Sequence, residues 1–319
     1  MRDKDERTEL KVATLESRAG LRVSVLNLGA TICSLEVPTA SGPANVVLSY
    51  PDIDDYPSDP FFLGTTVGPF ANRIDGARFE LGGEEFHLDA NESSTGHCLH
   101  GGSEGLHRQF FDIQTDSADS KIECRCDLPD GHGGFPGNRT VTVIYRMVNE
   151  LALAIDFRAT TDRDTTMSIA NHAYFNLGGP IADHELSIVA DAYTPTHNSD
   201  IPTGEIRSVA ETDFDWHSKR KVGDACFNHN FVLSTSNNEP QLAARLGLAG
   251  SGVELNLHTT QPGLQFYTGD FLERPFEARQ GLCLEAQAFP DAPNQPRFPS
   301  ARLSAGEGYW QRTIYEFIV

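Results

Sequence analysis

The sequence is poor in basic residues. Its 319 residues include 25 lysine and arginine residues against 45 aspartate and glutamate residues, which gives a formal net charge of −20. A negative field of this size repels phosphate backbones and anionic lipid surfaces, so we expect neither nucleic acid nor a membrane as a partner. A neutral small molecule meets no such repulsion, and the charge balance is compatible with a small-molecule partner.

The sequence also lacks long apolar runs and dense cysteines. No stretch approaches the roughly 18 apolar residues of a membrane helix, and residues 1–10 lack the apolar core of a secretory signal. The six cysteines are scattered, whereas a disulfide scaffold is usually short and rich in cysteine. We therefore expect buried free thiols and a cytoplasmic protein.

Helical periodicity is scarce as well. The nearest candidate helix, residues 241–248, is short and is soon followed by Gly250. Alternating apolar and polar residues are common instead, and residues 141–148 and 151–157 predict an antiparallel hairpin around a two-residue connection. Other strand-like runs cover residues 21–25, 185–190, 252–257, 263–268, 281–287 and 312–319.

Many short strands with frequent turns predict an all-β sandwich or barrel. The sequence contains no low-complexity linker and no fixed-period repeat. We therefore expect a single domain over residues 1–319, with the C-terminus inside a sheet.

Four segments depart from strand patterning and combine ionisable residues with glycine, proline and amide side chains. Such segments are typical of loops that present side chains at the ends of strands. They cover residues 68–76, 97–102, 171–179 and 284–296.

Each segment holds one candidate functional residue. Arg73 offers five hydrogen-bond donors in a fixed fork, and His100 and His172 can exchange a proton near neutrality. Glu285 follows the apolar residues 281–284, which predicts a place at the end of a strand, and it can act as a general base. Together they predict acid–base chemistry if the fold brings them together, which their spacing does not show. Taken singly, Arg73 could pair with a carboxylate, and each histidine could be a structural hydrogen-bonding residue.

Other chemistries have weaker support. His97, Cys98 and His100 are close in sequence, and Cys124 and Cys126 could supply thiolates, but no standard zinc-ligand spacing is present. The two thiols lie two residues apart in a strand-like run, where both would face the core. The glycine-rich residues 130–137 lack the Gly-Lys-Ser/Thr of a phosphate loop, and no Gly-x-Ser-x-Gly motif indicates a serine nucleophile.

Taken together and in order, several motifs resemble the aldose 1-epimerase (galactose mutarotase) family. The resemblance covers nearly the whole chain, and the motifs are specific as a set rather than singly. They are Asn-Arg-Ile at 72–74, Leu-His-Gly-Gly at 99–102, Asp-Gly-His-Gly-Gly-Phe-Pro-Gly at 130–137, Asn-His-Ala-Tyr-Phe-Asn-Leu at 171–177, Phe-Asn-His-Asn-Phe-Val-Leu at 227–233, and Leu-Glu-Ala-Gln-Ala-Phe-Pro-Asp at 284–291 with Asn294 following.

The resemblance implies a large antiparallel β-sandwich that binds a free monosaccharide and needs no cofactor or metal. It implies that Glu285 is the general base at the anomeric hydroxyl and that His172 is the general acid at the ring oxygen. His100 would hydrogen-bond near the ring oxygen, and Arg73 and Asn72 would bind sugar hydroxyls. Ring opening, rotation about C1–C2 and reclosure would exchange the anomers of a hexose such as galactose or glucose. A monomer or a homodimer is expected.

This mechanism carries an electrostatic expectation. A carboxylate and an imidazolium placed close together each favour the charged form of the other. We therefore expect a lowered pKa for Glu285 and a raised pKa for His172.

The sequence departs from the family pattern in three places. Asn228 stands where members commonly carry an acidic residue that binds a sugar hydroxyl, so we expect weaker or altered hydroxyl recognition there. Pro69 stands where many relatives have arginine, and Phe111 stands at a position near which tryptophan is usual. These changes bear on sugar preference more than on the reaction.

Two alternatives stay open at this stage. A non-catalytic sugar-binding or sensing protein could use the same sandwich, although it would not need the acid–base residues. An epimerase of hexose 6-phosphates would need a basic pocket for the phosphate, and the net charge disfavours this only weakly.

Overall fold

The computed structural model describes residues 8–116, 120–234 and 239–319. Within these ranges the regular structure is antiparallel β-sheet, and the helices are short 3-10 turns. No helix in the described ranges is long and apolar enough to cross a membrane. The 3-10 turns are η2 (Ile53–Ser58), η3 (Asp75–Ala77), η4 (Leu106–Arg108), η5 (His132–Gly134), η6 (Ile181–Asp183) and η7 (Ala292–Asn294).

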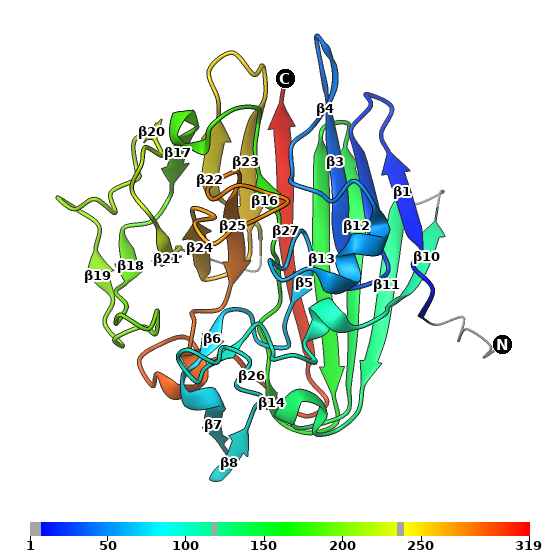
Figure 1. Ribbon diagram of the computed structural model, residues 1–319. Coiled ribbons are helices and arrows are strands. Elements are labelled where there is room, and N and C mark those ends of the chain that lie inside the picture. Colours follow the sequence, from blue (N-terminus) through cyan, green and yellow to red (C-terminus); the bar gives the residue numbers. More distant parts are fainter. Residues whose placement is uncertain (1–7, 117–119, 235–238) are drawn as a thin grey trace.

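A nine-stranded antiparallel sheet forms the back of the molecule, with the C-terminal strand β27 at its centre (Figure 1). The prediction that the C-terminus lies inside a sheet is therefore confirmed. In spatial order the strands are β10 (Asp112–Asp116), β11 (Lys121–Leu128), β12 (Arg139–Asn149), β13 (Ala152–Thr161), β27 (Gly308–Ile318), β23 (Glu254–Thr259), β22 (Gln241–Gly247), β17 (Glu185–Ile188) and β20 (Arg220–Lys221).

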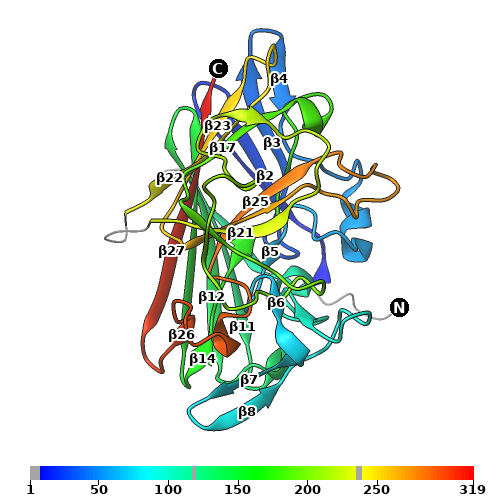
Figure 2. The same ribbon diagram turned by 90° about the vertical axis from the view of Figure 1, so that its left-hand side faces the viewer.

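Two smaller sheets pack on the same side of this long sheet, each over one half of it (Figures 1 and 2). The four-stranded sheet is β1 (Val12–Glu16), β2 (Arg22–Leu26), β3 (Thr31–Thr39) and β4 (Gly42–Asn45). The six-stranded sheet is β16 (Tyr174–Phe175), β25 (Leu282–Gln287), β24 (Gly263–Tyr267), β21 (Asn228–Val232), β18 (Ala192–Thr194) and β19 (Arg207–Ser208).

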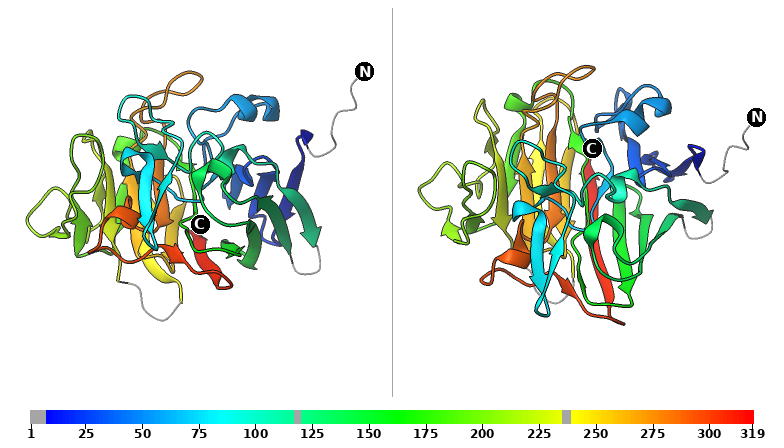
Figure 3. Two further views of the ribbon diagram at one scale, coloured as in Figure 1. Left: turned by 90° about the horizontal axis from the view of Figure 1, so that it is seen from below. Right: turned by 60° about the horizontal axis from the view of Figure 1, so that its bottom comes forward.

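Short strand pairs tie the loops together, and the segment with β7 and β8 lies at the lower end of the molecule in Figure 1 and comes toward the viewer in Figure 3. The pairs are β5 (Thr66–Val67) with β15 (Ala170–Asn171), β6 (Arg73–Ile74) with β9 (Cys98–Leu99), β7 (Arg78–Leu81) with β8 (Glu84–His87), and β14 (Thr165–Thr166) with β26 (Arg302–Leu303).

One large apolar core lies between the long sheet and the two smaller sheets. Its members come from alternate positions of facing strands, such as Val141 and Val143 on β12 and Val23 and Val25 on β2. Burying these side chains contributes about 25 cal/mol for each Å² of apolar surface removed from water. The arrangement confirms the predicted all-β sandwich.

The predicted hairpin is confirmed: β12 and β13 pair antiparallel, with a β-bulge between Met147 and Asn149. Cys124 and Cys126 are both buried, as predicted for thiols two apart in a strand. The general expectation of buried thiols is only partly correct, because Cys226 is exposed and Cys33 is half-buried, although all six cysteines are free.

Two local predictions are wrong. Residues 241–248 do not form a helix, because residues 241–247 are strand β22, hydrogen-bonded between β17 and β23. This pairing on both sides satisfies the backbone, and tertiary context overrides the weak helical pattern. Glu285 is not at the end of a strand but in the middle of β25 (Leu282–Gln287), where every side chain is buried.

Candidate active site

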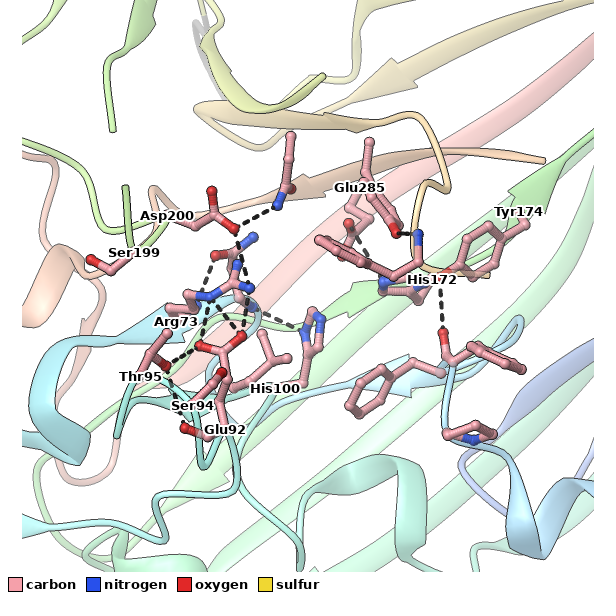
Figure 4. Close-up of a pocket in the computed structure, with 18 of the residues that line it drawn as sticks. Arg73, Glu92, Ser94, Thr95, His100, His172, Tyr174, Ser199, Asp200 and Glu285 are labelled. Carbon is pink, nitrogen blue, oxygen red and sulfur yellow. Dashed lines mark hydrogen bonds and ion pairs between the residues drawn. The ribbon is translucent and has the colours of Figure 1, made fainter. Parts of the chain in front are cut away.

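The candidate residues meet in an open cleft of about 460 Å³ beside the six-stranded sheet. All six residues predicted from the sequence line it (Figure 4). The structure thus brings together segments that are far apart along the chain. The six are Asn72, Arg73, His100, His172, Asn228 and Glu285.

Strand pairing explains why these segments meet. Arg73 on β6 pairs with Leu99 on β9, which places Asn72 opposite His100. His172 lies between β15 and β16, and β16 pairs with β25, the strand that carries Glu285. The two pairings deliver one histidine each to the same cleft.

Glu285 is almost completely buried, with 2% of its surface exposed. Its Oε2 atom has no hydrogen-bond partner among the described residues, and its Oε1 atom lies 3.8 Å from the Nε2 atom of His172. Burial raises the pKa of the Glu285 carboxyl to about 8, and the positive charge of Arg73 offsets only part of this effect. An unpaired buried carboxyl is costly, and at a cleft it marks a functional group.

His172 is held rigidly at the floor of the cleft. Its backbone N–H donates to Thr65, and its carbonyl accepts from the N–H of Gly64. Its Nδ1 atom faces the Cys283 sulfur at 3.6 Å, so Nε2 is the ring nitrogen directed at Glu285. Burial lowers the pKa of His172 to about 4.

The expected pKa shifts are therefore wrong in direction. The sequence argument considered only the attraction between Glu285 and His172. Both side chains are almost completely buried, and the loss of hydration disfavours both charged forms more than a contact of 3.8 Å favours them. At neutral pH the unliganded pair is a protonated carboxyl beside a neutral imidazole.

His100 is oriented by a reciprocal backbone contact with Asn72. Its backbone N–H donates to the Asn72 carbonyl, and its Nδ1 atom accepts from the Asn72 N–H at 3.1 Å. Because Nδ1 accepts, the neutral ring carries its proton on Nε2. Burial is the main cause that holds the pKa of His100 well below its usual value, and the neighbouring imidazoles of His172 and His107 and the guanidinium of Arg73 add to the effect. His100 is thus a hydrogen-bond donor rather than a cation.

Gly101 allows the His100 turn to approach its neighbour closely. Its φ is +87°, and a Cβ atom there would lie 2.1 Å from the Gly68 carbonyl oxygen. Only glycine fits such a left-handed conformation at this separation. The structure therefore explains why a glycine follows His100 directly in the sequence.

Arg73 does pair with carboxylates while it lines the cleft. Its Nε and NH2 atoms donate to both oxygens of Glu92, the shortest contact being 2.6 Å, and NH2 lies 3.4 Å from Asp200 (Figure 4). The Asn72 side chain accepts the backbone N–H of Arg73 at 2.8 Å. The NH1 group makes no hydrogen bond to a described residue and is the part of the fork left to meet a ligand.

Asn228 reaches the cleft, with its amide held between two side chains. Its Oδ1 atom accepts from Gln265 at 2.7 Å, and its Nδ2 atom donates to Asp200 at 3.2 Å. The other two departures from the family pattern, Phe111 and Pro69, are both buried and do not line the cleft.

Several cleft residues are missed by the sequence argument. Glu92 and Asp200 are two of 45 acidic residues, and nothing in their neighbourhoods sets them apart. Tyr174 lies inside a recognised motif and could have been chosen. Other aromatic residues line the rim without any sequence signal: Phe61, Phe62, Tyr267 and Phe271.

A metal ion is a possible occupant to test, because ligand atoms of His100, His172 and Glu285 lie within 4.8 Å of one another. The donor set does not fit. The Asn72 N–H occupies the Nδ1 lone pair of His100, so its Nε2 carries a proton, and Glu285 is protonated at neutral pH. The zinc sets considered from sequence do not assemble in the described part of the chain: Cys124 and Cys126 lie in the large core, and the group of potential ligands found there is His100, His172 and Glu285.

The comparisons with known proteins agree with this site. The aldose 1-epimerase family model matches residues 11–316. Galactose mutarotase of Mus musculus is 38% identical, over 94% of this chain and 92% of the mouse protein. Aldose 1-epimerase of Escherichia coli K12 is 33% identical, over 97% of this chain and 95% of the bacterial protein.

Solved structures show the same fold. An aldose epimerase homologue from C. elegans superposes with a TM-score of 0.90 at 28% identity, covering 97% of this chain and 99% of that one. Galactose 1-epimerase from Lactobacillus acidophilus gives a TM-score of 0.86 at 28% identity, covering 99% and 96%.

The fold and site define a sugar isomerase, and the chain belongs to the aldose 1-epimerase family. The predicted family, isomerase class and mutarotase activity are confirmed. Neither alternative, a sugar sensor or a hexose 6-phosphate epimerase, gains support from these relatives.

Proposed function

We propose that this enzyme interconverts the α and β anomers of a free hexose such as galactose or glucose, with Glu285 and His172 as its proton-transfer pair. The observation that carries the proposal is the pair itself: two buried groups 3.8 Å apart on the floor of an open cleft. The cleft has space for a hexose. The cleft is lined by Arg73 and three carboxyl side chains, which suits a neutral sugar better than a phosphate ester.

The reaction balances as two proton transfers. Ionised Glu285 removes the proton from the anomeric O1–H while protonated His172 gives its Nε2 proton to O5. The C1–O5 bond breaks and an aldehyde forms at C1. After rotation about C1–C2, the protonated Glu285 returns a proton to O1, neutral His172 removes the proton from O5, and the ring closes on the other face.

The protonation state of the free site fits one half of this cycle. The pair holds one proton, and burial places it on Glu285 rather than on His172. A protonated carboxyl beside a neutral imidazole is the state required for ring closure. Ring opening requires the proton on His172 and an ionised Glu285. The polar oxygens of the bound sugar stabilise these two charges, because they replace the hydration lost on burial.

The remaining predicted residues bind and orient the sugar. His100 donates its Nε2–H near O5 and supports proton delivery there, which its fixed tautomer allows. The free NH1 group of Arg73 donates to sugar hydroxyls, and Asn72 holds both His100 and Arg73 in place. Asn228 lines the hydroxyl-binding side. Every step is a proton transfer or a bond rotation, so we propose a monosaccharide as substrate and no cofactor.

The pH dependence of kcat/KM should report the buried pair. The active form has one proton, so activity should fall below about pH 4, where His172 gains a second proton, and above about pH 8, where Glu285 loses the only one. Polarimetry in buffers of equal ionic strength across this pH range, with the buffer-catalysed rate subtracted, measures this profile. A high-pH limb near 6.5, the ordinary value of histidine, would contradict the burial effect.

Polarimetry on freshly dissolved α-galactose and α-glucose tests the proposed function. The wild-type protein should bring both solutions to their equilibrium rotation faster than buffer alone, in proportion to its concentration. The ratio of kcat/KM for the two sugars measures preference. A rate equal to buffer with both sugars would overturn the assignment of free hexoses as substrates.

A further inference from the structure

We propose that Asp200 is a sugar-binding residue of this enzyme and supplies the negative charge that Asn228 lacks. This inference rests on the proposed function and concerns only how the substrate is recognised. It differs from the expectation of weakened recognition at Asn228, because a second element delivers a carboxylate to the same place.

Asp200 sits at the tip of a small hairpin loop over the cleft (Figure 4). The His197 N–H donates to the Ile201 carbonyl, and the Asp200 N–H donates to the His197 carbonyl. Ile201 is buried, with 4% of its surface exposed, and anchors the loop. The φ of Asp200 is +62°, a left-handed conformation that aspartate and asparagine tolerate better than most residues. The loop therefore holds the carboxylate in a defined position.

Asn228 acts as the support for this carboxylate. Its Nδ2 group donates to Asp200 at 3.2 Å, and because an ionised carboxylate only accepts hydrogen bonds, this contact fixes which end of the amide faces Asp200. The Oδ1 atom then accepts from Gln265 on the neighbouring strand. An aspartate at position 228 would instead repel Asp200. The amide at 228 and the acid at 200 are thus complementary.

Among the described carboxyl groups of the cleft, Asp200 is the exposed one with an oxygen open to a ligand. Glu92 is engaged by Arg73 and by the Thr95 hydroxyl, and Glu285 is buried at the reaction centre. The Asp200 side chain is 37% exposed, and its Oδ1 atom makes no hydrogen bond to a described residue. Sugar hydroxyls can fill that position.

Asp200 and Arg73 together present an acceptor and a donor side by side. The NH2 group of Arg73 lies 3.4 Å from Asp200 Oδ2, while Arg73 NH1 and Asp200 Oδ1 are both open. A hydroxyl can donate and accept, so two adjacent sugar hydroxyls match this pair. Hydrogen bonds to an ionised acceptor are about twice as strong as neutral ones. We infer that Asp200 contributes to hexose affinity and selectivity.

The test is Asp200→Asn, measured by polarimetry and by thermal unfolding. Asparagine keeps the left-handed turn and the size of the side chain, and removes only the charge. Loss of one charge-assisted hydrogen bond made in both ground and transition states should raise KM about tenfold. The kcat and the melting temperature should stay near wild type. Glu205→Gln, which removes an exposed charge from the same segment outside the cleft, should leave KM unchanged.

The charge exchange Asp200→Asn with Asn228→Asp sharpens the test. Asn228→Asp alone should also raise KM, because two carboxylates then face each other. The double variant restores one acid and one amide in the pair and should recover most of the wild-type KM. A structural role for Asp200 would instead lower the melting temperature without a selective change in KM.

Two results would overturn the inference: an unchanged KM in Asp200→Asn, or a raised KM that is the same for every monodeoxygalactose as for galactose. The second would show that no particular hydroxyl meets the carboxylate, whereas the sugar that lacks the bound hydroxyl should be insensitive to the substitution. Failure of the proposed function is distinguishable, since it would show as a wild-type rate equal to buffer before any variant is compared.

Discussion

Replacing Glu285 with glutamine should remove nearly all mutarotation above the buffer rate. Glutamine has the same size and can hydrogen-bond, but it cannot take the proton from the anomeric hydroxyl. Loss of one positioned general base typically costs about 10²–10⁴-fold in rate. Polarimetry of α-galactose, with wild type and variant at equal concentration in the same buffer, measures the effect.

Folding of the Glu285 variant is a separate readout. The Glu285 Oε2 atom has no partner among the described residues, so the substitution breaks no hydrogen bond at that atom. The melting temperature should therefore stay close to that of wild type. Glu316→Gln, which changes a carboxylate on β27 outside the cleft, should retain full activity. A well-folded Glu285→Gln protein with wild-type kcat would remove Glu285 from the mechanism.

Replacing His172 with glutamine should have a loss of similar size, about 10²–10⁴-fold in kcat. The amide can reach a sugar oxygen but cannot carry a proton to O5 or remove it during ring closure. The matched control is His107→Gln. His107 is a half-buried histidine that contacts the Phe62 ring, as His172 does, but it lies outside the cleft. That control should keep wild-type kcat.

A variant with both Glu285→Gln and His172→Gln distinguishes two residues that act together in one step from two residues that act independently. If Glu285 and His172 exchange protons with the same substrate in one step, neither residue accelerates the reaction without the other. The double variant should then be no slower than the slower single variant, because residues that act as a unit are strongly non-additive. A multiplicative loss, with all proteins folded, would argue that the two residues act in separate steps.

Local pattern was sufficient for much of the fold. The alternation in residues 141–148 and 151–157 predicted the β12–β13 hairpin, because only a strand with one buried face needs that period. The motifs around Arg73, His100, His172 and Glu285 carried the family resemblance. Their residue types also indicated acid–base chemistry. The segment 241–248 was misjudged because its strand state depends on neighbours that the local pattern does not contain.

The assembly of the site required the tertiary structure. The pairings of β6 with β9 and of β16 with β25 bring His100, His172 and Glu285 together, and these contacts are non-local. Burial then reverses the pKa shifts that charge attraction alone predicts, because hydration lost on folding outweighs a single contact.

Asp200 shows the same division most clearly. In the sequence it is one acid among 45, while in the structure it contacts Arg73 and Asn228 in the cleft. Residue types and spacing determined which chemistry this protein can perform. The strand order and the depth of burial decided which groups meet, how they are charged and where a sugar hydroxyl can bind, because those properties depend on neighbours that only folding supplies.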